Sequence, residues 1–236
     1  MATSDQALHQ ALWFKCLLAG AAVLLLGITV HALVPEPPIP AHSHPMAGDV
    51  LVNRAAGERI VFRQVPKGGA DGPSLIDVHL APHGAIPVQH VHPSTDEVFR
   101  VLQGKVRLVV EGKIHELKAG ESITVPAGQT HGASNQHDAP AHVEVAMEPT
   151  GGLNMAMTQV HGFLDQSGDS GGLTDFLQML RFAERYEVYR ADLPIWFQKL
   201  GITLVAPFAR ALGFRSFYAT YSEQARARNT TAKDDQ

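Results

Sequence analysis

Two stretches of this 236-residue sequence decide its fold: GAIPVQHVHPSTDEVFRVLQG at residues 84–104 and GESITVPAGQTHGASN at residues 120–135. In the first stretch, His90 and His92 are two residues apart, so on a strand both side chains point to the same face. Two imidazoles on an inward face are costly unless their nitrogens have partners, and a metal ion supplies such a partner. The pair is therefore a candidate metal-binding element.

A carboxylate and a third imidazole follow at spacings that would complete such a site. Pro93-Ser94-Thr95-Asp96 is typical of a turn, so the chain should reverse and bring Glu97 back beside the two imidazoles. Asp96 is expected on the opposite face. Two histidines and one carboxylate suit a divalent transition ion with open positions. After the turn Pro126-Ala127-Gly128, His131 is expected to re-enter as the fourth ligand.

Short strand-like segments surround these stretches between about residues 49 and 162. They alternate or run apolar, and Gly-containing turns separate them, which indicates an antiparallel sandwich or barrel with no helix of useful length. The expected strands are IVFRQV (60–65), SLIDVHL (74–80), EVFRVL (97–102), VRLVV (106–110), KIHEL (113–117), SITV (122–125) and HVEVAM (142–147).

The two stretches resemble the two motifs of the cupin superfamily, in its single-domain, type-2-like form. The first motif is G-x5-H-x-H-x4-E-x6-G and the second is G-x5-P-x-G-x2-H-x3-N. Every fixed position of both motifs is filled in this sequence, by Gly84, His90, His92, Glu97 and Gly104 and then by Gly120, Pro126, Gly128, His131 and Asn135.

This resemblance implies a mainly β fold, a small antiparallel jelly-roll barrel over residues 49–162. It also implies one divalent transition metal, with Fe, Mn, Ni, Cu and Zn not distinguished, held by His90, His92, Glu97 and His131. Asn135 is expected to tie down the local backbone. The other histidines, among them His79, His83, His115, His137 and His142, are expected to be exposed or to support the site without binding the ion.

Cupins carry out many reactions, so the fold cannot name one. The leading hypothesis is a metal-dependent enzyme, similar to a dioxygenase, acting on a small oxygen-rich or aromatic molecule. Glu97 could also act as a general base, since a carboxylate in a dry interior can have a raised pKa. The alternative is a cupin without catalysis that binds or senses a metal or a small ligand at the membrane.

The N-terminal part predicts a membrane segment. Residues 16–34, CLLAGAAVLLLGITVHALV, hold no Asp, Glu, Lys or Arg, and a helix of this length at about 1.5 Å per residue roughly matches the ~30 Å hydrocarbon layer. A transmembrane helix or signal anchor is therefore expected over residues 12–34, after a tail at 1–11. A secretory signal cleaved near Val30-His31-Ala32 is the alternative, and it would leave a secreted protein.

Charges suggest how such a segment is oriented. Lys15 lies on the N-terminal side, whereas no Lys or Arg follows it before Arg54. The positive-inside tendency then places the N-terminus in the cytoplasm and the barrel outside the cell membrane, on a single-pass protein. The proline- and histidine-rich residues 35–48 are expected to form an extended linker.

A helical extension is expected over residues 173–222, followed by a polar tail over 223–236. One helix should cover residues 173–189, and a second should begin at Pro194. Apolar residues recur at every fourth position of the second helix, at Trp196, Leu200, Leu204, Phe208 and Leu212. That stripe is too apolar to face water alone. The barrel, a second subunit in a homodimer, or the membrane interface could cover it.

Composition excludes some functions. The formal net charge of −4, without a cluster of Lys and Arg, argues against nucleic-acid binding. Cys16 is the single cysteine, so no intrachain disulfide exists. A small-molecule ligand or substrate and the membrane remain as the expected partners.

Overall fold

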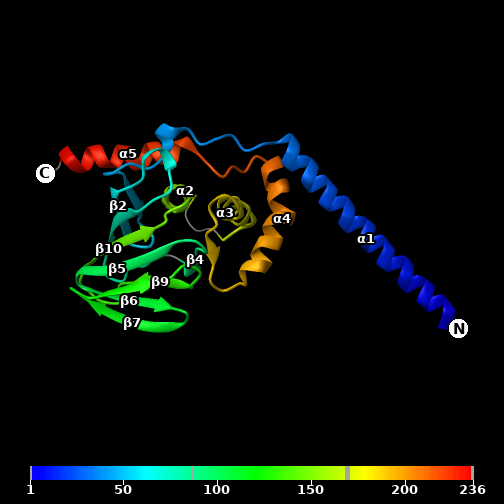
Figure 1. The fold of residues 1–236 in the computed structure, drawn as a ribbon, viewed down its shortest axis with the longest axis horizontal. Helices are drawn as coiled ribbons and strands as arrows, with labels where there is room; N and C mark the ends of the chain where they lie inside the picture. Colours follow the sequence, from blue (N-terminus) through cyan, green and yellow to red (C-terminus); the bar gives the residue numbers. More distant parts are fainter. Residues whose placement is uncertain (1, 87, 168–170, 235–236) are drawn as a thin grey trace.

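The computed structural model describes residues 2–86, 88–167 and 171–234, in which two antiparallel sheets enclose the main core (Figure 1). The six-stranded sheet has the order β1 (Val50–Asn53), β2 (Glu58–Gln64), β3 (Ser74–Leu80), β10 (Ala141–Glu148), β5 (Asp96–Gln103) and β8 (Ser122–Val125). The five-stranded sheet has the order β11 (Tyr189–Arg190), β4 (His90–Val91), β9 (His131–Ser134), β6 (Lys105–Val110) and β7 (Lys113–Lys118). The seven expected strands are therefore present, whereas β1, β4, β9 and β11 were not expected from the sequence.

Alternation of side chains forms the core between the sheets. Along β10, Val143 and Val145 are buried, while the intervening His142 and Glu144 are partly exposed on the outer face. Each fully buried side chain of this size stabilises the fold by about 2 kcal/mol relative to its exposed state. Because the strand period is two, this alternation fixes which face of the sheet looks inward.

The expectation of a closed barrel was wrong, because the described strands form two separate sheets. On the five-stranded sheet, one edge of β4 pairs with β9 and the other edge pairs with β11 from the C-terminal part of the chain.

Helix α2 (Leu153–Ser167) was not expected from the sequence, which indicated no helix of useful length over residues 49–162 and a next helix only from residue 173. Polar residues are buried on it together with apolar ones, so its pattern is not clearly amphipathic. Asn154 donates a hydrogen bond to Ser74 over 2.6 Å, and Gln159 exchanges hydrogen bonds with the backbone of Tyr218. These contacts satisfy the buried polar groups, as burial requires, but they become visible only in the folded chain.

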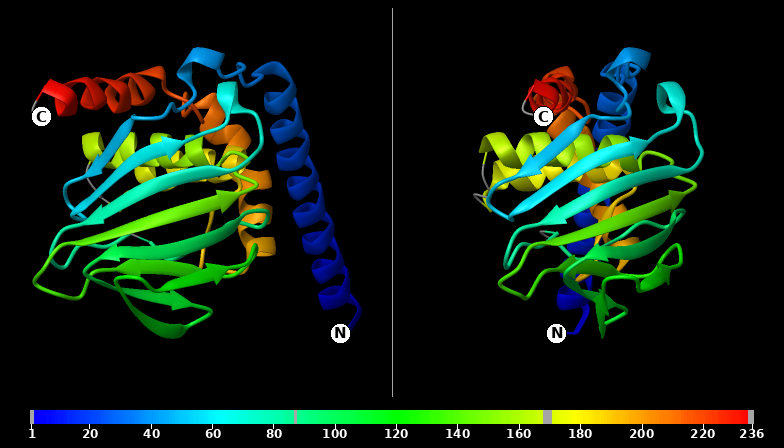
Figure 2. Two further views of the ribbon diagram at one scale, coloured as in Figure 1. Left: turned by 60° about the vertical axis from the view of Figure 1, so that its left-hand side comes forward. Right: turned by 90° about the vertical axis from the view of Figure 1, so that its left-hand side faces the viewer.

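The C-terminal part holds three helices: α3 (Leu173–Tyr186), α4 (Ile195–Ala211) and α5 (Ala219–Asp234). Helix α5 covers most of the residues expected to be a polar tail, and it packs beside α2 with Tyr221 and Ala225 buried (Figure 2). Residues 235–236 lie outside the described part. The helix forms because α2 and β1 supply an apolar surface for its inner face.

Helix α4 begins and ends close to the expected residues, but it does not bury its apolar stripe. Its buried residues include Ala206 and Ala209, whereas Trp196, Leu200 and Leu212 are 68%, 49% and 71% exposed. Packing on the chain's own sheets, one of the three expected covers, therefore does not account for these side chains.

Helix α1 (Ala2–Leu33) projects away from the sheets (Figure 1). Within Leu8–Leu33, an 18-residue window has a mean hydropathy of 2.3, and 6% of that window is buried. Within the described chain this is the one helix long and apolar enough to cross a membrane. A signal sequence meets the same criterion. Near its C-terminal end, the buried Gly27 lies against Pro207 of α4.

Candidate metal centre

The sheets bring the four predicted ligands to one place in the interior. His90 on β4 and His131 on β9 are directly paired across the ladder, and His92 follows immediately after β4. Glu97 lies on β5 of the facing sheet, where it is buried together with Phe99, while Asp96 is exposed on the other face as expected. The four side chains thus come from both sheets.

The distances are those of a compact group. Nitrogens of His90, His92 and His131 all lie within 4.8 Å of one another. The two carboxylate oxygens of Glu97 lie 3.3 Å from Nε2 of His92 and 3.0 Å from Nε2 of His131. Glu97 therefore joins the group through these two imidazoles.

Backbone carbonyls fix the orientation of each imidazole. The Nδ1 atoms of His90, His92 and His131 lie 3.0, 3.1 and 3.0 Å from carbonyl oxygens of Val88, Thr95 and Gln129, respectively. A carbonyl only accepts hydrogen bonds, so each Nδ1 carries a proton, and Nε2 is the nitrogen of each ring that is left to bind an ion. Such contacts orient histidine ligands in metal sites, and the motif itself does not reveal them.

The electrostatics of the group differ from the sequence-based expectation for Glu97. Burial alone would raise the pKa of its carboxyl group, but the imidazoles of His131 and His92 outweigh burial and hold that pKa well below its usual range. The expectation of a raised pKa was therefore wrong. Glu97 is a carboxylate at neutral pH, which suits a metal ligand better than a proton-carrying acid.

Burial and the charge of Glu97 also shift the pKa values of His90 and His131. Burial and the neighbouring His131 lower the pKa of His90 to about 4, so its Nε2 is unprotonated at neutral pH. Burial also acts to lower the pKa of His131, but Glu97 outweighs it and the net pKa is raised. An ion binding here would therefore have to displace the proton that Glu97 favours on His131.

The residues present fit a divalent transition ion. Nε2 of His92 and Nε2 of His131 are buried, and neither makes a well-aligned hydrogen bond. Buried nitrogens of this kind normally have a partner. Three imidazole nitrogens and one carboxylate oxygen form a donor set that suits Fe, Mn, Ni, Cu or Zn better than Ca²⁺ or Mg²⁺.

The turn Pro126-Ala127-Gly128 connects the segments that carry the candidate ligands. The exposed Asp96 accepts a hydrogen bond from the amide of Ala127 over 2.7 Å, and Gly128 donates to the carbonyl of His92 over 3.0 Å. Gly128 has φ +80°, a backbone conformation that glycine adopts without strain. The turn therefore aligns the start of β5, the residue after β4 and the approach to β9.

Asn135 and Gly84 explain two more motif positions. The Asn135 amide donates to the carbonyls of Ala81 and Ala139 over 3.0 and 2.7 Å, which confirms that it ties down the local backbone. A Cβ atom at Gly84 would lie 2.6 Å from the carbonyl oxygen of Gly57. Any other residue at position 84 would push these segments apart.

Two further features of the structure were not predicted from the sequence. Strand β11 pairs Arg190 with His90, so the C-terminal extension borders β4, the strand that carries His90. A second group, formed by Asp77, His79 and His142, lies on the outer face of the six-stranded sheet. The spacing of Asp77 and His79 by two residues on an expected strand was a usable signal, but their partner on a distant strand was not visible.

Comparison with known proteins agrees with the fold. Residues 76–147 match the family described as "Cupin domain". Quercetin 2,3-dioxygenase from Bacillus subtilis (strain 168) is 38% identical over 88 residues, which cover 34% of this chain and 26% of that protein. Tetracenomycin polyketide synthase protein TcmJ from Streptomyces glaucescens is 31% identical over 81 residues, which cover 34% of this chain and 54% of that protein.

The matched segments thus span 26% and 54% of the lengths of these relatives. Among solved structures, a sugar phosphate isomerase of the cupin superfamily from Silicibacter pomeroyi DSS-3 is 26% identical. That likeness covers 48% of this chain and 76% of the other, with a TM-score of 0.38.

Proposed function

From the cupin domain at residues 76–147, we propose that this chain holds one divalent transition-metal ion through His90, His92, Glu97 and His131. We propose further that the protein is a metal-dependent enzyme acting on a small oxygen-rich or aromatic molecule, with chemistry of the oxygenase type. The 38% identity of one segment to a quercetin 2,3-dioxygenase supports this choice of reaction class.

The observation that carries the proposal is the arrangement of the three imidazoles. Each Nδ1 is held by a backbone carbonyl, and the ligating nitrogens of all three lie within 4.8 Å of one another beside a buried carboxylate. Orientation of this kind is prepared before an ion binds, which lowers the entropic cost of binding. Purely structural histidines do not need three such anchors around one point.

A bound transition ion would supply Lewis acidity toward an oxygen atom of a substrate and, if it is redox-active, electron transfer. The chain's own groups set the conditions around it. Glu97 stays ionised, so it contributes negative charge to the site, while its lowered pKa makes it a weak acceptor for a proton from a substrate hydroxyl. The buried Phe99 ring, 5.9 Å from the His131 ring between centroids, keeps this region apolar.

Oxygen consumption is the direct test of the reaction class. Full-length protein purified from its native host is analysed for metal content and then offered a panel of catechols, flavonols and other small oxygen-rich molecules in an oxygen electrode. We expect uptake with at least one compound, in proportion to metal content. His131→Ala should lose this uptake, because it removes one ligand.

His115→Ala is the matched control, because His115 lies on the edge strand β7 and is expected to have no part in the site. It should retain the uptake. A zinc-loaded protein that binds compounds of the panel without turnover would overturn the enzymatic proposal and favour a binding or sensing role.

We also propose that α1 anchors the chain in the cell membrane as a single span, with the cupin domain outside the cytoplasm. The hydropathy and length of Leu8–Leu33 support a span, and Lys15 before it, with no Lys or Arg until Arg54, supports the orientation. The exposed Trp196 and Leu200 of α4, a helix that contacts α1, would then lie near lipid.

Carbonate extraction of membranes, followed by blotting, tests this anchor. We expect the full-length chain to remain in the membrane pellet, because about 20 apolar residues in a helix are enough to hold a protein in the bilayer. A chain starting after residue 34 should be released. A mature wild-type protein that begins near Leu33 and is fully soluble would show that the segment is a cleaved signal.

A further inference from the structure

The group formed by Asp77, His79 and His142 lies on the outer face of the six-stranded sheet, on the side away from the predicted metal centre. Asp77 and His79 alternate with buried apolar residues of β3, and His142 does the same on the neighbouring β10. His79 and His142 are directly paired across the ladder. The pairing of these two strands therefore places three potential metal ligands on one surface.

Their geometry is close to that of a metal site. Ligand atoms of the three residues lie within 4.8 Å of one another, and Nε2 of His142 is 3.2 Å from a carboxylate oxygen of Asp77. A tetrahedral ion about 2.1 Å from each ligand holds them about 3.4 Å apart. Asp77 and His142 already stand at this separation, whereas the His79 ring stacks on that of His142 and has to turn out of the stack to direct a nitrogen at the same ion.

The protonation of the group suits a cation. Burial, followed by the nearby charge of His142, lowers the pKa of His79, so its imidazole is neutral at neutral pH. Burial acts to raise the pKa of Asp77, but the hydrogen bond from Arg63 and the nearby His142 imidazole outweigh burial, and the net pKa is lowered. Nε2 of His142 is buried without a well-aligned hydrogen bond.

Arg63 both orients the group and limits its affinity. Its guanidinium lies 2.6 Å from one oxygen of Asp77, which leaves the other oxygen facing His142. The positive charge of the guanidinium also repels a cation. An ion should therefore bind here more weakly than at a site with an uncompensated carboxylate.

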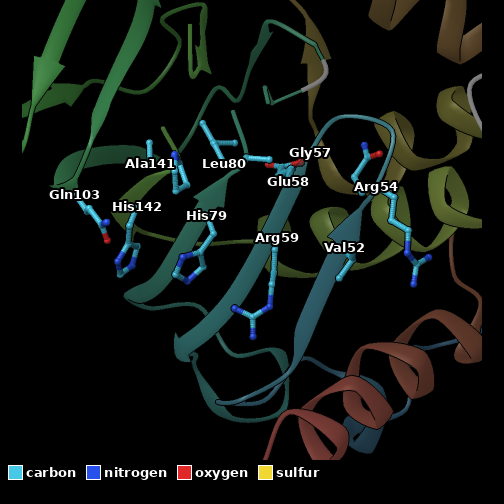
Figure 3. Close-up of a pocket in the computed structure, with 13 residues that line it drawn as sticks. Val52, Arg54, Gly57, Glu58, Arg59, His79, Leu80, Gln103, Ala141 and His142 are labelled. Atoms are coloured by element: carbon cyan, nitrogen blue, oxygen red, sulfur yellow. The ribbon is translucent and has the colours of Figure 1, made fainter. Parts of the chain in front are cut away.

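Access from solvent is open. Figure 3 shows the rings of His79 and His142 side by side, projecting in the same direction as the side chains of Arg59 and Gln103. The two imidazoles line a surface pocket of about 460 Å³ and stack with their ring centroids 4.2 Å apart. Remaining coordination positions of an ion could therefore be filled by water or by a small ligand in the pocket.

We propose that Asp77, His79 and His142 form a second site for a divalent transition ion such as Zn²⁺, on the outer face of the six-stranded sheet. This assignment differs from the expectation that His79 and His142 do not bind an ion. It is independent of the proposed reaction, because no residue is shared between the two groups.

Titration of the full-length chain with Zn²⁺ alone, by isothermal calorimetry in detergent, tests the second site. The wild type should bind two ions per chain, one of them more weakly. His142→Ala and Asp77→Asn should each abolish the weaker event and leave the tighter one unchanged. Arg63→Gln should tighten the weaker event several-fold, because it removes the repelling charge.

His115→Ala again serves as the control and should bind as the wild type does. Thermal unfolding followed by circular dichroism establishes that each variant is folded. Zn²⁺ binding that is unchanged in both His142→Ala and Asp77→Asn would overturn the second site. That result would not bear on the interior site, which His131→Ala tests separately.

Discussion

Replacing His92 with Ala is expected to weaken metal binding at the interior site by at least about 100-fold, since even the loss of a residue that merely supports a ligand costs 10–100-fold. The reason is geometric: His92 is buried, its Nδ1 is held by Thr95, and its Nε2 lies 3.3 Å from Glu97. No other described side chain of this group can take its place without breaking its own backbone contact.

The measurement is native mass spectrometry of full-length protein carrying the ion acquired in the native host. His92→Ala should lose the interior ion, while His115→Ala retains it. Circular dichroism of both variants separates loss of ligand from loss of fold. Undiminished loading in a folded His92→Ala chain would contradict the ligand assignment.

Replacing Arg181 with Met is expected to cost about 3 kcal/mol of unfolding free energy, the lower end of what breaking a buried ion pair costs. Arg181 on α3 is fully buried and forms ion pairs with Glu36, in the segment after α1, and with Glu184. Burial, followed by the charge of Arg210, lowers the pKa of Arg181 to about 10, so it remains charged at neutral pH. Its removal leaves two carboxylates without their main partner.

We expect a loss of unfolding free energy at the lower end of this range because Arg210 approaches the same carboxylates. Its guanidinium lies 3.5 Å from Glu184 and 3.9 Å from Glu36. Thermal unfolding of the full-length chain measures the loss. Arg190→Ala, which breaks an exposed ion pair with Asp192, is the control and should cost less than about 1 kcal/mol. A loss for Arg181→Met no larger than this control would contradict the role of the cluster.

This cluster also has a consequence for the organisation of the chain. Arg210 donates a hydrogen bond to the carbonyl of Val34 over 3.0 Å, and Ser216 donates to Glu36. The segment after α1 is therefore fastened to α3, α4 and the residues that follow α4. The sequence predicted an extended linker over residues 35–48 from its prolines, and these contacts with distant segments could not be read from it.

Local spacing accounts for what could be predicted about the site. His90, His92 and Glu97 lie within eight residues of each other, and a turn between them is enough to bring them together. Gly84 and Gly128 are required by close backbone approach and by positive φ, which leave a trace in the residue type itself. The same reasoning placed Asp96 on the opposite face.

Contacts between distant segments account for the features that could not be predicted from the sequence. Helix α2 buries polar residues whose partners lie on β3 and near α5, so its sequence does not show a simple amphipathic pattern. Strand β11 is a strand only because β4 offers an unpaired edge. The pKa of Glu97 depends on His131, 34 residues away, and burial alone suggested the wrong direction.

Local sequence was therefore enough to predict the antiparallel strands and the grouping of the four candidate metal ligands, because strand alternation and turn chemistry act over a few residues. Tertiary structure alone decided that the sheets stay open, that α4 leaves Trp196 and Leu200 exposed, and that Asp77 meets His142 across the outer face. These outcomes depend on which edges and faces remain available after the core has formed, and that is a property of the whole packed chain rather than of any segment.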